Sequence, residues 1–214
     1  MQLTPALTKL CGYQSVAGAY LGPKGQTVRK QATIGGEVVL TCEVDLFDAE
    51  RDPFPHADGQ FKLVLTCEII EHLRRDPMHL LLEARRVLEA EGLLLLTTPN
   101  CSSATAITRV LCGDRNPYTF SSYPRPNSRD TEHAPLHIRE YTVAEISELL
   151  DAAGFAVEVL FTERIADFPE TNWVEDILKA HRLPTDLRGE QTCCLARKRP
   201  DATIRRYPEF LYTE

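Results

Sequence analysis

Residues 61–100, FKLVLTCEIIEHLRRDPMHLLLEARRVLEAEGLLLLTTPN, decide the fold class of this chain. The stretch opens with a short apolar run, FKLVLTC, that predicts a buried strand. Asp76 and Pro77 then predict the start of a helix, because an aspartate can cap free N–H groups and proline suits the first helical position. We expect this helix to end at Gly92 and the run LLLLTT over residues 93–98 to form a second buried strand.

Strand and helix patterns alternate along the rest of the chain as well. Short buried strands are predicted over residues 15–21, 37–44, 155–161 and 192–196. Helices are predicted over residues 4–10, 103–111, 142–154 and 173–181, and a long ordered loop or lid over residues 113–136. Strands separated by helices imply an α/β fold with a mainly parallel sheet and helices on both faces. Ligands on such sheets bind at the C-terminal ends of the strands.

The composition is that of an ordinary globular protein with one domain. The 214 residues are 43% apolar and 26% charged, and the formal net charge is -7. This charge argues against nucleic acid or an anionic membrane as the main partner, since both reward clustered Lys and Arg. The seven cysteines lack zinc-ligand spacing, and no signal-peptide pattern or bilayer-spanning run is visible. We therefore expect a cytoplasmic protein.

The quoted stretch closely resembles the central block of class I S-adenosylmethionine-dependent methyltransferases of the type 11-like group. The family pattern is a strand of the FDLV type, E-x-x-E-H, an amphipathic helix ending in RVL, a glycine turn and a strand ending in TTPN. The resemblance implies a Rossmann-like class I methyltransferase fold with a reversed final hairpin. It places a partial methyltransferase domain over residues 1–199 and a C-terminal tail, expected to dock on the domain, over residues 200–214.

One departure from the family concerns its opening strand and glycine-rich turn, E/D-x-G-x-G-x-G. The chain shows neither, and Gly18, Gly22 and Gly25 are too loosely spaced to replace the turn. The first strand of this fold is central, so without it the sheet would expose unpaired backbone groups in its middle. We therefore expect that the recorded chain begins late, through a truncated gene model or a fragment. A degenerate homologue is the alternative.

The resemblance suggests five residues that would contact the cofactor. Tyr20 ends the strand where the family places a ribose-binding acid; it could stack or donate a hydrogen bond, or be a plain strand-end aromatic. Asp45 or Asp48 matches an acid that faces the adenine amino group, although aspartates near turns are also common in solvated loops. Cys67 and Glu68 end the strand that lines the cofactor and acceptor cleft.

The segment Glu68-Ile-Ile-Glu71-His72 is a candidate metal site. Two carboxylates and an imidazole suit a divalent cation such as Mg²⁺. The same arrangement occurs in ubiquinone-biosynthesis O-methyltransferases and in small-RNA 2′-O-methyltransferases, and His137 precedes REYT where the latter have a further His. A metal there would lower the pKa of the acceptor hydroxyl. The alternative is a structural brace, because many class I methyltransferases carry I-E-H-L without a metal.

The expected function is methyl transfer from S-adenosylmethionine to an O or N acceptor, mainly by placing the acceptor against the methyl group. The acidic charge and compact size favour a small molecule or a sugar over RNA. The alternative is a truncated or decayed domain without catalytic activity that serves as a binding module.

Overall fold

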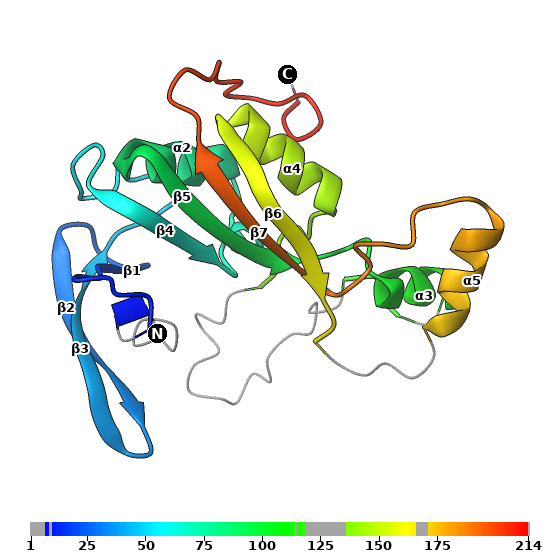
Figure 1. Cartoon of the computed structure of the whole chain (residues 1–214), viewed down its shortest axis with the longest axis horizontal. Helices are drawn as coiled ribbons and strands as arrows, with labels where there is room; N and C mark the ends of the chain where they lie inside the picture. Colours follow the sequence, from blue (N-terminus) through cyan, green and yellow to red (C-terminus); the bar gives the residue numbers. More distant parts are fainter. Residues whose placement is uncertain (1–6, 9, 114, 119–135, 166–170, 214) are drawn as a thin grey trace. The chain divides into compact units, whose positions relative to one another are not determined.

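The structure is a computed structural model that describes residues 7–8, 10–113, 115–118, 136–165 and 171–213. The chain divides into two compact units, Met1–His56 and Ala57–Glu214 (Figure 1). Each unit has its own sheet. No helix among these residues is long and apolar enough to cross a membrane.

The first unit holds a three-stranded sheet in the order β1-β3-β2. Its strands are β1 (Gly18–Tyr20), β2 (Gln26–Ile34) and β3 (Glu37–Leu46). β1 is parallel to β3, whereas β2 and β3 form an antiparallel hairpin. The pair Gly35-Gly36 closes this hairpin, and both glycines have positive φ angles, 60° and 88°, as a tight hairpin turn requires.

The second unit is built around a four-stranded sheet in the order β4-β5-β7-β6. Its strands are β4 (Phe61–Cys67), β5 (Leu88–Pro99), β6 (Phe155–Glu163) and β7 (Gln191–Lys198). β4 is parallel to β5, and β7 runs antiparallel to both β5 and β6. These pairings confirm the α/β fold with a reversed final hairpin. Within the described residues β4 pairs with β5 alone.

Two capped helices pack on this sheet. α2 (Pro77–Val87) begins at Asp76, whose Oδ1 accepts a hydrogen bond from His79 N at 3.2 Å. α4 (Val143–Ala152) begins with the expected capping box at Thr142. α2 contacts β5 and α4 contacts β6, and their inner faces supply fully buried leucines and isoleucine that form the core: Leu80, Leu81, Ile146, Leu149 and Leu150.

Two further helices contact each other beyond the end of the sheet (Figure 1). They are α3 (Ala104–Cys112) and α5 (Asn172–Ala180), which confirm the helices predicted over residues 103–111 and 173–181. Ser103 caps α3 by accepting from Ala106 N at 3.1 Å.

The prediction that the helix starting at Pro77 ends at Gly92 is wrong. α2 ends at Val87 and β5 starts at once with Leu88, so Gly92 lies inside the strand. The pairing of β4 with β5 shifts register near this point, and Glu91 has a φ of 61°. A Cβ at Gly92 would lie 3.0 Å from the Glu89 carbonyl oxygen, so the glycine serves close packing rather than helix termination.

The C-terminal tail docks on the start of α2. Arg206 forms an ion pair with Asp76, and the Tyr212 hydroxyl donates to Asp76 Oδ1 at 2.6 Å. Met78 N in turn donates to the Tyr212 hydroxyl at 3.2 Å. These contacts confirm that the tail packs against the domain. Most of residues 4–10 and 113–136, predicted as a helix and a loop, lies outside the described residues.

Candidate functional site

The candidate site begins where β4 ends and the chain enters a short 3-10 helix, η1 (Ile70–His72). The carbonyl oxygen of Glu71 accepts backbone hydrogen bonds from Ile138 N at 2.7 Å and from Arg139 N at 3.2 Å. These bonds bring the segment around His137 back to the C-terminal end of β4, although the two segments lie far apart in the chain. The sequence-based hypothesis required this return.

Three of the four predicted metal ligands come together. One ligand atom each from Glu71, His72 and His137 lies within 4.8 Å of the others. His72 Nε2 is 3.6 Å from Glu71 Oε1, and the two imidazole rings meet edge to face with centroids 4.8 Å apart. The side chain of Glu71 is fully buried, while those of His72 and His137 are 22% and 13% exposed. The cluster therefore lies just below the surface, within reach of a ligand.

Glu71 is a buried carboxylate with uneven hydrogen bonding. Its Oε2 accepts from the Thr98 hydroxyl at 3.0 Å, but no donor among the described residues reaches its buried Oε1. Burial disfavours the charged form and raises the pKa of Glu71 to about 7. Near neutral pH this carboxyl can therefore hold or release a proton.

The imidazole of His72 is fixed by a backbone carbonyl. Its Nδ1 lies 3.0 Å from the oxygen of Leu136. A carbonyl oxygen can only accept, so in the neutral ring Nδ1 carries the hydrogen and the lone pair is on Nε2. That lone pair is on the nitrogen next to Glu71 Oε1. Two electron-pair donors this close together favour a proton, a cation or another hydrogen-bond donor between them.

Glu68 does not join this group of three, and the four-ligand set is corrected to three. Its exposed carboxylate accepts from the Thr97 hydroxyl at 2.7 Å and from the Gln191 side-chain amide. Glu68 has a φ of 55°, so the chain leaves the strand direction there. The ends of β5 and β7 thus supply the donors that hold it. Whether it contacts a cofactor stays a prediction.

The thiol of Cys67 sits beside Glu68 at the same strand end. Burial raises the pKa of the Cys67 thiol above its usual range; the hydrogen bond with Thr97 opposes this shift, and the nearby carboxylates of Glu68 and Glu71 add to it. The thiol therefore stays neutral and is suited to contact a ligand by packing rather than to attack it.

The remaining predicted cofactor residues lie in the first unit. β1 and β3 are parallel and pair Ala19 with Asp45, so Tyr20 and Asp45 lie at neighbouring strand ends. Tyr20 is 61% exposed, and Lys30 Nζ lies 4.0 Å from its ring centroid. The ammonium group of Lys30 therefore lies over this ring in a cation–π contact. The role of Tyr20 toward the cofactor stays a prediction.

The two aspartates differ in what they bind. Asp45 accepts from the Thr27 hydroxyl at 2.9 Å and lies 3.6 Å from His56 Nε2. Asp48 accepts from Glu50 N at 2.9 Å, as an aspartate in a tight turn does. Asp45 therefore projects from a strand end, whereas Asp48 is engaged in its own loop.

Sequence reasoning missed Glu140 and Thr98. Glu140 has a fully buried side chain, and its Oε1 lies 3.2 Å from His137 Nδ1. Thr98 is the second threonine of TTPN and holds Glu71. The signal for Glu140 was the spacing of three residues from His137, but a charged residue there is also common on a solvated turn.

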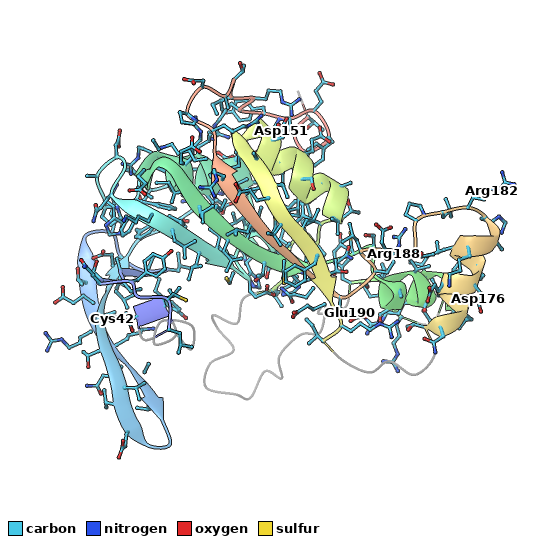
Figure 2. The ribbon with its side chains drawn as sticks, in the orientation of Figure 1. Cys42, Asp151, Asp176, Arg182, Arg188 and Glu190 are labelled. Carbon is cyan, nitrogen blue, oxygen red and sulfur yellow. The ribbon has the colours of Figure 1, made fainter. Side chains whose placement is uncertain are left out.

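A second polar region lies toward α3 and α5. Figure 2 shows Arg188 and Glu190 near the end of the sheet and α3, while Asp176 and Arg182 project from the α5 region. A cavity of about 250 Å³ lies here, and its wall includes Thr162, Arg164, Thr171, Val174, Leu178 and Arg188. It combines hydroxyl, guanidinium and apolar groups.

The chain is similar in sequence to known methyltransferases. Residues 2–96 match the family model for a methyltransferase domain. A protein of Mycolicibacterium smegmatis named as a probable S-adenosylmethionine-dependent methyltransferase is 35% identical over 128 residues, which cover 60% of this chain and 41% of that protein. One with the same description from Mycobacterium tuberculosis is 33% identical over 112 residues, covering 52% and 33%. The chain is thus similar to S-adenosylmethionine-dependent methyltransferases over part of its length, and it spans less than half the length of these relatives.

Solved structures of two S-adenosylmethionine-dependent methyltransferases are also similar. The one from Methanosarcina mazei is 15% identical with a TM-score of 0.48, and the match covers 73% of this chain and 67% of that one. The one from Archaeoglobus fulgidus is 16% identical with a TM-score of 0.46, covering 72% and 67%.

Proposed function

We propose that the protein to which this chain belongs transfers a methyl group from S-adenosylmethionine to an oxygen or nitrogen acceptor. The buried group of Glu71, His72 and His137 at the C-terminal end of β4 carries the proposal. Ligands of α/β sheets bind at this end, and the relatives that the chain resembles are named as probable S-adenosylmethionine-dependent methyltransferases. The sulfonium is already activated, so the residues need only bind and orient the acceptor and exclude water.

The acceptor is proposed to be a small molecule or a sugar. The net charge of -7 disfavours a polyanion. The site itself presents electron-pair donors, and the guanidinium group of Arg139, two residues after His137, is engaged by Glu145 at 2.6 Å. Such a site suits a neutral hydroxyl or amine better than a phosphate.

The three clustered side chains fit a divalent cation. One carboxylate oxygen without a donor and two imidazoles form the donor set. With two nitrogens and one oxygen, this set favours Mn²⁺, Fe²⁺, Co²⁺ or Zn²⁺ over the Mg²⁺ suggested by a carboxylate-rich set. When bound, such a cation would lower the pKa of the acceptor hydroxyl.

Without a metal, Glu71 is the candidate general base. Its raised pKa, about 7 through burial, lets it take a proton from an acceptor near neutral pH. His72 Nε2, 3.6 Å away, can receive that proton in turn. This second candidate chemistry keeps the same residues and differs in its need for metal.

The test measures transfer of a labelled methyl group from S-adenosylmethionine to a panel of small hydroxyl- and amine-bearing acceptors. We expect transfer that EDTA abolishes and Mn²⁺ or Co²⁺ restores, loss of transfer in Glu71→Gln and His137→Ala, and no change in Glu148→Gln, an exposed acid of α4. Transfer that resists EDTA but fails in Glu71→Gln would support the general base instead. Absence of both cofactor binding and transfer would favour a non-catalytic binding module.

A further inference from the structure

We propose that Glu140 is a positioning residue that holds His137 with its Nδ1 protonated, so that Nε2 is the nitrogen that binds the metal. This inference rests on the proposed cation site. It adds to that site a residue outside the group of three. Glu140 touches neither the acceptor nor the cation in this proposal, and it acts through His137.

The contact between the two residues is short and enclosed. His137 Nδ1 lies 3.2 Å from Glu140 Oε1. The side chain of Glu140 is fully buried and that of His137 is 13% exposed. An ionised carboxylate can only accept, so Nδ1 must donate, and the single hydrogen of a neutral imidazole is then on Nδ1. The lone pair is left on Nε2, the nitrogen that a cation can use.

The backbone makes this arrangement rigid. Ile138 N and Arg139 N both donate to the carbonyl oxygen of Glu71, which anchors the turn between His137 and Glu140 on the metal site itself. Tyr141 follows, almost fully buried at 1% exposure, and its carbonyl oxygen accepts from Cys101 N. The carboxylate of Glu140 therefore has little freedom to leave the imidazole.

The same short segment also orients the other imidazole. The oxygen of Leu136 fixes the hydrogen of His72 on Nδ1. Residues 136–140 thus give both rings the same tautomer, one through a carbonyl and one through a carboxylate. In metal sites a second-shell acceptor of this kind fixes ring orientation and makes the ligating nitrogen more basic.

Charge also favours a cation at this place. Glu71 and Glu140 are two carboxylates with fully buried side chains, placed around two imidazoles. Among these four side chains, neutral rings leave two negative charges when both acids are ionised, and a divalent cation would reduce this local charge.

The experiment uses the full chain and two readouts. Co²⁺ is titrated by calorimetry and by its visible absorption, and the imidazole nitrogens are observed by ¹⁵N NMR after treatment with EDTA. Glu140→Ala removes the acceptor, and Glu140→Gln keeps an acceptor of the same shape without the charge. Glu145→Gln is the matched control, since Glu145 is a neighbouring part-buried acid that bonds to Arg139 and Thr142 instead of His137.

We expect Glu140→Ala to weaken Co²⁺ binding by about 10- to 100-fold, the range for removal of a second-shell partner. Glu140→Gln should lie between Glu140→Ala and the wild type, and Glu145→Gln should bind like the wild type. In the metal-free wild type, His137 should carry its hydrogen on Nδ1, and Glu140→Ala should lose this preference.

Three outcomes distinguish this inference from the proposed function. Unchanged Co²⁺ binding and an unchanged tautomer in the folded Glu140 variants would overturn the inference. A wild type that binds no Co²⁺ but shows the Nδ1 tautomer, lost in the variants, would support the positioning role and contradict the cation site. If Glu140→Ala does not fold, Glu140→Gln alone decides the question. Wild-type Co²⁺ affinity in Glu140→Gln, together with an equal mixture of the two His137 tautomers, would overturn the positioning role of Glu140.

Discussion

Glu71 and Glu190 are two buried glutamates at the same end of one sheet, and their surroundings differ. Glu71 follows β4, and Glu190 directly precedes β7, whose first residue pairs with Pro99 at the end of β5. Glu190 accepts from the Thr105 hydroxyl at 2.7 Å and from Ile165 N at 3.2 Å, so both of its oxygens are used. Glu71 has a buried oxygen that no donor among the described residues reaches.

The difference separates a structural acid from a candidate functional one. A buried carboxylate with both oxygens satisfied links elements, here α3, the end of β6 and β7. One with an unsatisfied oxygen is destabilising unless a proton, a cation or a substrate completes it. Burial alone would rank the two equally, and hydrogen bonding distinguishes them.

The largest effect should come from removing the satisfied acid. Glu190→Ala leaves the Thr105 hydroxyl and Ile165 N without their partner inside the protein, so we expect it to lower the free energy of unfolding by about 3 kcal/mol. Urea denaturation followed by fluorescence of Trp173, the single tryptophan, measures this. Glu71→Gln should cost far less in metal-free protein. A larger loss in Glu71→Gln than in Glu190→Ala would reverse the comparison.

The pH dependence of stability should come from Glu71. Its pKa is about 7 in the folded chain because of burial, and about 4.5 when unfolded, so the folded state binds the proton more tightly. The resulting stabilisation is fully present below about pH 4.5 and is lost as pH rises to about 7. Its size is about 3 kcal/mol. The free energy of unfolding of the metal-free wild type should fall over this pH range, that of Glu190→Gln should fall in the same way, and that of Glu71→Gln should not. Identical pH profiles for the wild type and Glu71→Gln would contradict the prediction.

Metal addition should stabilise only a chain with an intact Glu71 site. At a Co²⁺ concentration of about 100 times Kd, binding to the folded state alone adds about 2.7 kcal/mol. We expect a higher Tm for the wild type and for Glu190→Gln, and no increase for Glu71→Gln. Binding should strengthen from pH 6 to pH 8, because the cation competes with the proton on Glu71. An equal Tm increase in Glu71→Gln would place the metal elsewhere.

A third acid, Asp76, gives the smallest expected effect. It is satisfied by Arg206, Tyr212 and His79 N, like Glu190, but it is only partly buried. Tyr212→Phe removes one of these bonds and should lower the free energy of unfolding by about 1 kcal/mol. Tyr207→Phe is the control, because this ring is 64% exposed and its hydroxyl is not needed for the Asp76 contacts. Equal losses in the two variants would show that the Tyr212 bond is not stabilising.

Local signals in the sequence predicted much of the second unit. β4 matches its predicted range, and the Asp76 cap and the Thr142 capping box start α2 and α4 as expected. These features depend on residues within one turn of each other, so the sequence alone contains them. The strand β2 was missed although Gly35-Gly36 is a hairpin signal, because its polar residues do not resemble a buried strand.

The sequence by itself contained the resemblance to methyltransferases and the pair Glu71-His72, because the family pattern is contiguous and adjacent residues cannot separate. Only the tertiary structure decided which partners complete that pair. It turned Glu68 toward Thr97 and Gln191, and it brought His137 and Glu140 to the end of β4. These choices depend on hydrogen bonds between segments far apart in the chain, and no local propensity encodes such bonds.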